Sequence, residues 1–290
     1  MSPRMTSSDR TLIFLHIPKT AGTTLYEILD HAFRSAETLT FDGYNHPEEI
    51  PEFIRAPEGK RARYNLIKGH LDFGLHRYIP RDSTYVTLLR EPISRIVSFY
   101  DHARRHPQHY LYPVLKNGGD LKKILKTHAT TELFNQQTRM IAGDEWCDLN
   151  RPVDAAALER AKDNMRKHFA VVGLTEEFDA SLLLIRRAAS TKMPFYRKRN
   201  VAPTDARSDA LDAETRGLVC EANTLDVELY KFGRELFNAQ RRAAGMMFEA
   251  ELRSFQLLNR GREAWLRARD NAKQVLRKRR AASIEAKPTV

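Results

Sequence analysis

Residues 11–29 read TLIFLHIPKTAGTTLYEIL, and this stretch decides the fold class. The segment Thr11–Ile17 is a short apolar run rich in strand-forming side chains, and Pro18–Gly22 follows it at once. From Thr23 onward, apolar side chains recur with the helical period at Leu25, Ile28, Leu29, Ala32 and Phe33. The sequence therefore predicts a strand, a tight loop and a helix at its start.

Strand-like and helix-like segments continue to alternate along the chain. Further strands are predicted at 64–68, 84–89 and 169–174. Helices are predicted at 92–100, across 120–168 with breaks at Gly143 and Pro152, at 176–189, and from 213 almost to 280. Residues 41–63 are rich in Pro and charge and predict a loop. This order predicts an α/β fold: a mostly parallel central sheet flanked by helices, a P-loop-like strand–loop–helix, and a long helical C-terminal extension.

The composition fits a folded chain that does not cross a membrane. The chain has 290 residues, of which 42% are hydrophobic, and none of its apolar runs approaches the ~18 residues of a membrane span. No apolar stretch precedes Leu12, and Cys147 and Cys220 lack the spacing of a disulfide framework or a metal site. We therefore expect a cytoplasmic protein, and peripheral contact with the inner face of the membrane is the alternative left open.

The positive charge is concentrated near the C-terminus. The net charge is +11, and residues 241–280 hold twelve Lys or Arg side chains against four Asp or Glu, a net of +8. We therefore expect a main domain at 11–240, a basic helical extension at 241–280, and disordered ends at 1–10 and 281–290. Such charge favours an anionic partner. Nucleic acid is not expected, because the basic residues lack interleaved stacking aromatics and no recognition motif occurs.

The extension also carries apolar side chains at roughly helical spacing, namely Phe248, Leu252, Phe255, Leu258, Trp265 and Leu266. This face can pack on the main domain or on a second copy of the chain, as in a homodimer. The basic face can instead contact an anionic membrane surface or simply face solvent. Packing or dimerisation is favoured over membrane contact.

The loop after the first strand has the composition of an anion-binding site. Lys19 supplies a mobile charge, Gly22 permits close backbone approach, and Thr20, Thr23 and Thr24 offer hydroxyl groups at the start of a helix. The full P-loop pattern GxxxxGK[ST] is absent, no Walker-B-like strand follows, and GxGxxG does not occur. These absences disfavour a Mg²⁺-dependent NTPase and a dinucleotide enzyme. An ordinary strand–helix turn capped by Thr is the alternative.

Two segments carry a family resemblance. FLHIPKTAGTTL at 14–25 resembles the 5′-phosphosulfate segment of sulfotransferases that use 3′-phosphoadenosine 5′-phosphosulfate (PAPS), most closely the carbohydrate branch that includes heparan sulfate 2-O-sulfotransferase. TLLREPISRIVSFY at 87–100 resembles the 3′-phosphate segment of that family: a strand ending in Arg-x-Pro, then a helix with Ser eight residues after the Arg. Weaker similarity extends the match over about residues 11–235.

The resemblance implies PAPS as co-substrate, no metal, and a set of donor-binding residues: Lys19, Thr20, Ala21, Gly22, Thr23, Thr24, Arg90 and Ser98. A guanidinium at a strand end can form a charge-assisted fork with a phosphate, which supports Arg90. A salt bridge to Glu91 and a buried helix serine are the alternatives for Arg90 and Ser98. The family also has a basic loop over the nucleotide, which carries over loosely to Arg197 and Lys198; a solvated charge run is equally compatible.

The catalytic residues predicted on this basis are Lys19 and His70. The resemblance gives Lys19 the role of neutralising the leaving bisphosphate at its bridging oxygen. His70 follows a predicted strand in a Gly-His context like that of the family, and a neutral imidazole suits proton abstraction near pH 7. Asp72 can be the base or orient His70, and a capping or core histidine is the alternative role for His70. His76 is a weaker candidate, and His16 is expected to pack or to support the loop.

The resemblance therefore implies a sulfotransferase that moves a sulfuryl group from PAPS to a hydroxyl of a saccharide or glycolipid. A small-molecule or tyrosine acceptor is the alternative within the same chemistry. A basic protein that binds membranes or nucleic acid is the alternative from another class. The loops at 41–60 and 106–120 are expected to shape the acceptor pocket, and their sequence does not identify the acceptor.

Overall fold

The computed structural model describes residues 10–34, 36–43, 46–143, 153–192, 196 and 211–285. Its centre is a sheet of five parallel strands in the order β2-β3-β1-β4-β5. The strands are β1 (Thr11–Leu15), β2 (Thr38–Phe41), β3 (Leu66–Gly69), β4 (Ser83–Leu89) and β5 (Phe169–Leu174). The predicted α/β fold with a parallel central sheet is confirmed.

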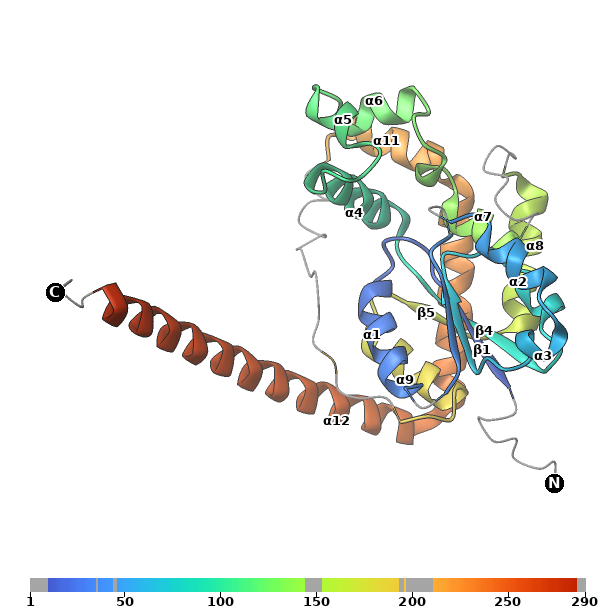
Figure 1. The fold of residues 1–290 in the computed structure, drawn as a ribbon. Helices are drawn as coiled ribbons and strands as arrows, with labels where there is room; N and C mark the ends of the chain where they lie inside the picture. The colour runs from blue at the N-terminus through green and yellow to red at the C-terminus, as the bar shows by residue number, and fades with distance from the viewer. Residues whose placement is uncertain are drawn as a thin grey trace.

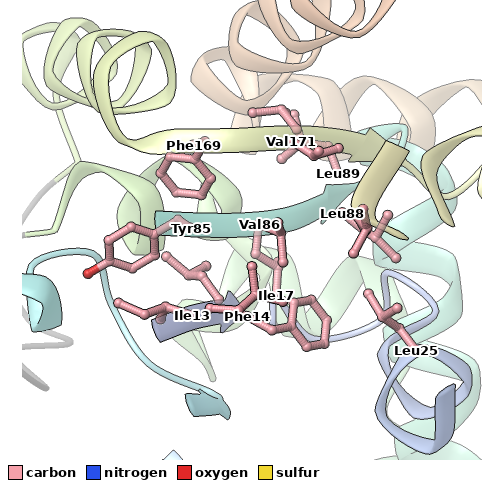
Figure 2. Packing of buried hydrophobic residues seen from close by; sticks show 14 of the residues in the cluster. Ile13, Phe14, Ile17, Leu25, Tyr85, Val86, Leu88, Leu89, Phe169 and Val171 are labelled. Carbon is pink, nitrogen blue, oxygen red and sulfur yellow. The ribbon is translucent and has the colours of Figure 1, made fainter. Parts of the chain in front are cut away.

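The inner strands form the core because both faces of the sheet are covered. All five residues of β1 are buried, and Tyr85 and Val86 of β4 are fully buried. Figure 2 shows Ile13 and Phe14 of β1 beside Tyr85 and Val86 of β4, with Phe169 of β5 at one end of the strands and Leu25 near the other end. A parallel sheet that is covered on both faces requires strands with near-continuous apolar runs, and β1 and β4 have them.

Helices cover the two faces of the sheet. In Figure 1, α1 and α9 lie on one side, and α2, α3 and α8 lie on the other. The bounds are α1 (Gly22–Ala32), α2 (Glu49–Arg55), α3 (Glu58–Arg61), α8 (Ala155–His168) and α9 (Phe178–Ala188). Parallel strands need such crossovers, and right-handed crossovers place the helices on both faces.

The prediction of a loop across 41–63 is wrong for α2 and α3, and the short edge strand β2 was not predicted. Ile50 and Phe53 of α2 are buried, and the Phe53 ring meets the Phe41 ring edge-on at 5.7 Å. Pro51 stands in the first turn of α2, where a missing N–H is tolerated. Tertiary burial of two side chains therefore stabilises a helix too short to be stable alone.

A second hydrophobic cluster sits beyond the carboxyl edge of the sheet. Four helices build it around Ile96, Phe99 and Val219, and they gather at the top of Figure 1. They are α4 (Pro92–Arg105), α5 (Tyr112–Lys116), α6 (Leu121–Lys126) and α11 (Ala213–Ala222). The 3₁₀ helix η3 (Thr131–Leu133) joins this cluster through Leu133, whereas η2 (Leu75–Tyr78) and the helix α7 (Gln136–Ala142) pack in the main core. Pro92 begins α4, as its sequence position predicted.

Helix α12 (Thr224–Glu285) continues past the main body and is interrupted at Gly245, whose φ is 76°. Arg241 and Glu249 form a two-point ion pair across the break, at 2.6 and 2.8 Å. Phe248 and Leu252 are buried on the main domain, whereas Trp265 is 61% exposed. The later turns extend away from the domain in Figure 1, so the first turns after Gly245 pack on it and the rest does not.

Candidate active site

The loop between β1 and α1 has an unusual backbone. Lys19 and Ala21 have φ values of 72° and 66°, in the left-handed region. This conformation costs roughly 1 kcal/mol or more for each non-glycine residue and is concentrated at functional sites. Helix α1 begins without a side-chain cap, so the backbone N–H groups of its first turn can serve an anionic ligand.

The threonines of this loop are not equivalent. Thr20 is fully buried, and its hydroxyl donates to the carbonyl of Ile17 at 2.8 Å. The hydroxyl hydrogen of Thr20 is therefore already donated within the turn. The backbone N–H of Thr20 remains as its donor to a phosphate. Thr23 is exposed and Thr24 is buried, so Thr23 offers the more accessible hydroxyl.

Arg90 lies beside the loop because β4 pairs directly with β1. Its Nη1 donates to the carbonyl of Lys19 at 2.9 Å, so the two motifs meet at one edge of the sheet. Glu91 caps α4, accepting from the N–H groups of Ile93 at 3.0 Å and of Ser94 at 2.7 Å. Ser98 lies half-buried on α4, two turns beyond that cap.

Lys19 lies in a cationic environment. Burial, together with the charges of Arg90 and Arg105, lowers the pKa of Lys19 to about 8, while Glu132 acts in the opposite direction. The ammonium is therefore still the main form at pH 7, and the surplus of positive charge favours an anionic ligand there. The arrangement can stabilise negative charge that develops on a leaving phosphate.

His70 extends from the carboxyl end of β3 into the same region. Its ring centroid lies 4.5 Å from that of His16, and the His16 ring lies 4.9 Å from that of Tyr26. Burial lowers the pKa of His70 below its usual 6.5; the charge of Asp42 acts in the opposite direction, and the charge of Lys19 lowers the pKa further. The imidazole is therefore neutral near pH 7, which is the form that a general base requires.

Gly22 and His16 are in very close contact. A Cβ added at Gly22 would lie 1.7 Å from Nε2 of His16. His16 is buried with its ring against Tyr26 and His70, so it supports the loop, as the sequence suggested. Only glycine leaves room for this imidazole under the first turn of α1.

His76 is not brought to this edge. Its Nδ1 lies 3.1 Å from the hydroxyl of Tyr85, and its ring lies 4.7 Å from that of His168. His168 precedes β5, and Tyr85 lies in the amino-terminal half of β4, at the opposite end of the strands from Leu25 in Figure 2. Asp72, two residues after His70, is half-buried and stays an alternative base.

Sequence reasoning missed Glu132, a half-buried carboxylate that interacts electrostatically with Lys19. The hydroxyl of Tyr110 donates to it at 2.5 Å, and burial raises the pKa of Glu132 above its usual value. Arg105 of α4 was missed for the same reason: no spacing relates either residue to the loop. Arg197 and Lys198 lie outside the described residues. Within the described ranges, no cluster of three or more His, Cys, Asp or Glu side chains could hold a metal ion.

Comparison with known proteins agrees with this geometry. The family model described as galactose-3-O-sulfotransferase matches residues 1–282. The chain belongs to the galactose-3-O-sulfotransferase family. This membership confirms the resemblance to carbohydrate sulfotransferases that residues 14–25 and 87–100 indicated.

The chain is 24–29% identical to three individual relatives over the aligned residues. It is 29% identical over 269 residues to galactose-3-O-sulfotransferase 3 of Homo sapiens, covering 85% of this chain and 61% of that protein. The match to the Mus musculus protein of the same name is 28% over 300 residues and covers 94% and 66%. Uronyl 2-sulfotransferase of Mus musculus is 24% identical over 211 residues, with 62% and 49% covered. The chain thus spans about two thirds or less of the length of these relatives.

The expectation of a cytoplasmic protein at the inner face of the membrane is wrong. The galactose-3-O-sulfotransferases to which the chain aligns are Golgi-resident membrane enzymes. Within the part of the chain that the structure describes, none of the helices combines the length and the apolar character needed to cross a bilayer.

Proposed function

We propose that this protein transfers the sulfuryl group of PAPS to a hydroxyl of a saccharide. The observation that carries the proposal is the meeting of three features at one edge of the sheet: the uncapped loop with Lys19, the guanidinium of Arg90, and the neutral imidazole of His70. Membership of a sulfotransferase family supports this chemistry over a basic protein that only binds membranes or nucleic acid.

The donor is held at both anionic ends. The backbone N–H groups from Thr20 to Thr24 and the ammonium of Lys19 bind the 5′-phosphosulfate, as helix N-termini bind phosphate elsewhere. Arg90 and Ser98 bind the 3′-phosphate, and Arg197 and Lys198, which lie outside the described residues, remain predicted nucleotide contacts. In this proposal the charges of Lys19 and Arg90 supply the electrostatic stabilisation of the donor, so the reaction needs no metal.

The transfer is an in-line displacement at sulfur. The acceptor hydroxyl oxygen forms a bond to sulfur as the bond from sulfur to the 5′-phosphate oxygen breaks. A ring nitrogen of His70 takes the hydroxyl proton, and Lys19 stabilises the charge on the departing adenosine 3′,5′-bisphosphate. Asp72 is the competing candidate for the proton.

The acceptor is a saccharide, free or as the sugar of a glycolipid. Relatives named for galactose and uronyl sulfation support this class over a small-molecule or tyrosine acceptor.

We also propose that a second copy of the chain contacts the protruding part of α12, where Leu258 and Trp265 are each 61% exposed. Light scattering of the wild type and of Leu258→Glu checks this contact: a monomeric wild type would contradict it.

Transfer of labelled sulfate from PAPS to a panel of galactosides and uronate-containing oligosaccharides tests the function. We expect the wild type to label at least one saccharide and Lys19→Ala to label none, because Lys19 acts mainly in the transition state. Lys123→Ala is the matched control, since Lys123 is an exposed lysine on α6, outside the segments expected to shape the acceptor pocket. Near-normal turnover by Lys19→Ala at saturating donor, with a normal unfolding curve, would remove Lys19 from the mechanism.

A further inference from the structure

We infer that Asp226 is a positioning residue for Arg90, acting through Gln137. The inference rests on the proposed function, because it concerns how the 3′-phosphate of the donor is recognised. It adds residues of α7 and α12 to a site that the two sequence motifs place on β1, β4 and α4.

The backbone of Arg90 is held at two points by one buried side chain. The N–H of Arg90 donates to Oε1 of Gln137 at 3.0 Å, and Nε2 of Gln137 donates to the carbonyl of Arg90 at 3.0 Å. Arg90 follows the last residue of β4, where the ladder to β1 has ended. The Gln137 amide thus pairs with the backbone N–H and carbonyl of Arg90, as a neighbouring strand would. These two bonds fix the position of the Cα from which the guanidinium extends.

Gln137 is in turn fixed by Asp226. Oδ2 of Asp226 accepts from the N–H of Gln137 at 3.1 Å, and Oδ1 accepts from the N–H and the hydroxyl of Thr138, each at 2.8 Å. All three residues are fully buried. The carboxylate therefore satisfies backbone donors of the first turn of α7 that would otherwise have no partner within the helix.

The connection between the two helices is reciprocal. Oδ1 of Asn135, the residue before α7, accepts from the N–H groups of Leu225 and Asp226 at 3.0 and 3.1 Å. Asn223 accepts from the N–H of Asn135 at 3.0 Å. Each helix start thus caps the other, so the orientation of Gln137 depends on where α12 begins.

This arrangement predicts a selective defect. In Asp226→Asn, an NH₂ group replaces one acceptor oxygen and faces a backbone N–H, so the turn that carries Gln137 must shift. A residue that only stabilises the fold would weaken all ligands alike, or none. A residue that positions Arg90 should weaken binding of the 3′-phosphate far more than binding of the rest of the nucleotide.

Calorimetric titration of the full chain with adenosine 3′,5′-bisphosphate and adenosine 5′-monophosphate provides the test, the readout being the ratio of the two dissociation constants. We expect the wild type to prefer the bisphosphate, and Arg90→Ala to reduce that preference by roughly 10- to 100-fold. Asp226→Asn should reduce it by about tenfold, as loss of an outer support commonly does. Gln137→Met removes both bonds to the Arg90 backbone and should act likewise, which keeps the test decisive if Asp226→Asn fails to fold.

Asn164→Leu is the matched control, because Asn164 donates to the carbonyls of Ile141 and Ala142 at the other end of α7. It should lower stability and leave the preference unchanged. An unchanged preference in both Asp226→Asn and Gln137→Met would overturn the inference while leaving Arg90 in its role. A wild type without preference, or Arg90→Ala with the full preference, would overturn the role of Arg90 in the proposed function and the inference with it.

Discussion

Replacement of Gly22 by alanine sets two opposing effects against each other. Alanine is more favourable than glycine within a helix by about 1 kcal/mol, and Gly22 is the first residue of α1. The added Cβ would nevertheless lie 1.7 Å from Nε2 of His16. Ordinary contact needs about 3.5 Å, so the imidazole or the turn must move by roughly 2 Å.

The clash should outweigh the helix propensity. His16 is buried, and its ring lies 4.5 Å from that of His70 and 4.9 Å from that of Tyr26, so a displaced imidazole presses on these neighbouring rings. Overpacking of this kind costs about 1–3 kcal/mol. We therefore expect Gly22→Ala to lower the free energy of unfolding by about 1–2 kcal/mol, and kcat to fall by up to ~100-fold as His70 is displaced.

Urea unfolding and steady-state transfer assays of four proteins measure this: the wild type, Gly22→Ala, His16→Ala and the double variant. Once the imidazole is absent, alanine at position 22 should be neutral or stabilising relative to His16→Ala alone, giving a coupling of more than 1 kcal/mol. Additive effects, or a Gly22→Ala protein as stable and as active as the wild type, would refute the argument from the contact.

Three further predictions concern the chemistry. The pKa of Lys19 is lowered to about 8, and its ammonium is the active form. The kcat/KM for PAPS should therefore fall as the pH rises above ~8, and Lys19→Arg should shift this fall to higher pH. A flat pH profile from 7 to 10 would contradict the prediction. His70→Ala should slow transfer by roughly 10²–10⁴-fold with little change in donor affinity. The wild-type rate should fall as the pH drops below 6.5, because the pKa of His70 is lowered, and this fall should be absent in His70→Ala. Loss of activity in Asp72→Asn but not in His70→Ala would assign the base to Asp72. Ser98→Ala should weaken adenosine 3′,5′-bisphosphate by roughly 3- to 10-fold and leave adenosine 5′-monophosphate unchanged, which titration of both nucleotides would show to be wrong if the losses are equal.

Local patterns in the sequence determined the elements that carry the chemistry. The strand at 169–174 and the helix start at Pro92 were predicted at the residues where they occur. A buried parallel strand needs an unbroken apolar run, and a helix needs apolar side chains at the helical period. Both patterns can therefore be recognised within a short stretch of sequence. The segment from Lys19 to Thr24 likewise carried its own chemical signature.

Short amphipathic helices could not be recognised from the sequence pattern. Helix α2 spans only Glu49–Arg55, which is too short to be stable by itself. Its stability comes from Ile50 and Phe53, which are buried in the core. The Pro and charged residues of this region led to the prediction of a loop, because only two apolar residues indicated a helix. In the fold, burial of those two side chains stabilises the helix.

Only the tertiary structure decided how the site is supported. The bonds from Gln137 to Arg90, and from Asp226 to the turn that carries Gln137, join residues far apart in the chain. The contact that demands glycine at position 22 comes from His16, across the loop. Sequence periodicity reports which face of an element is buried, whereas the partner of a buried polar group is set by how whole elements dock. That is why the residues expected to contact the donor could be predicted, and the residues that hold them in place could not.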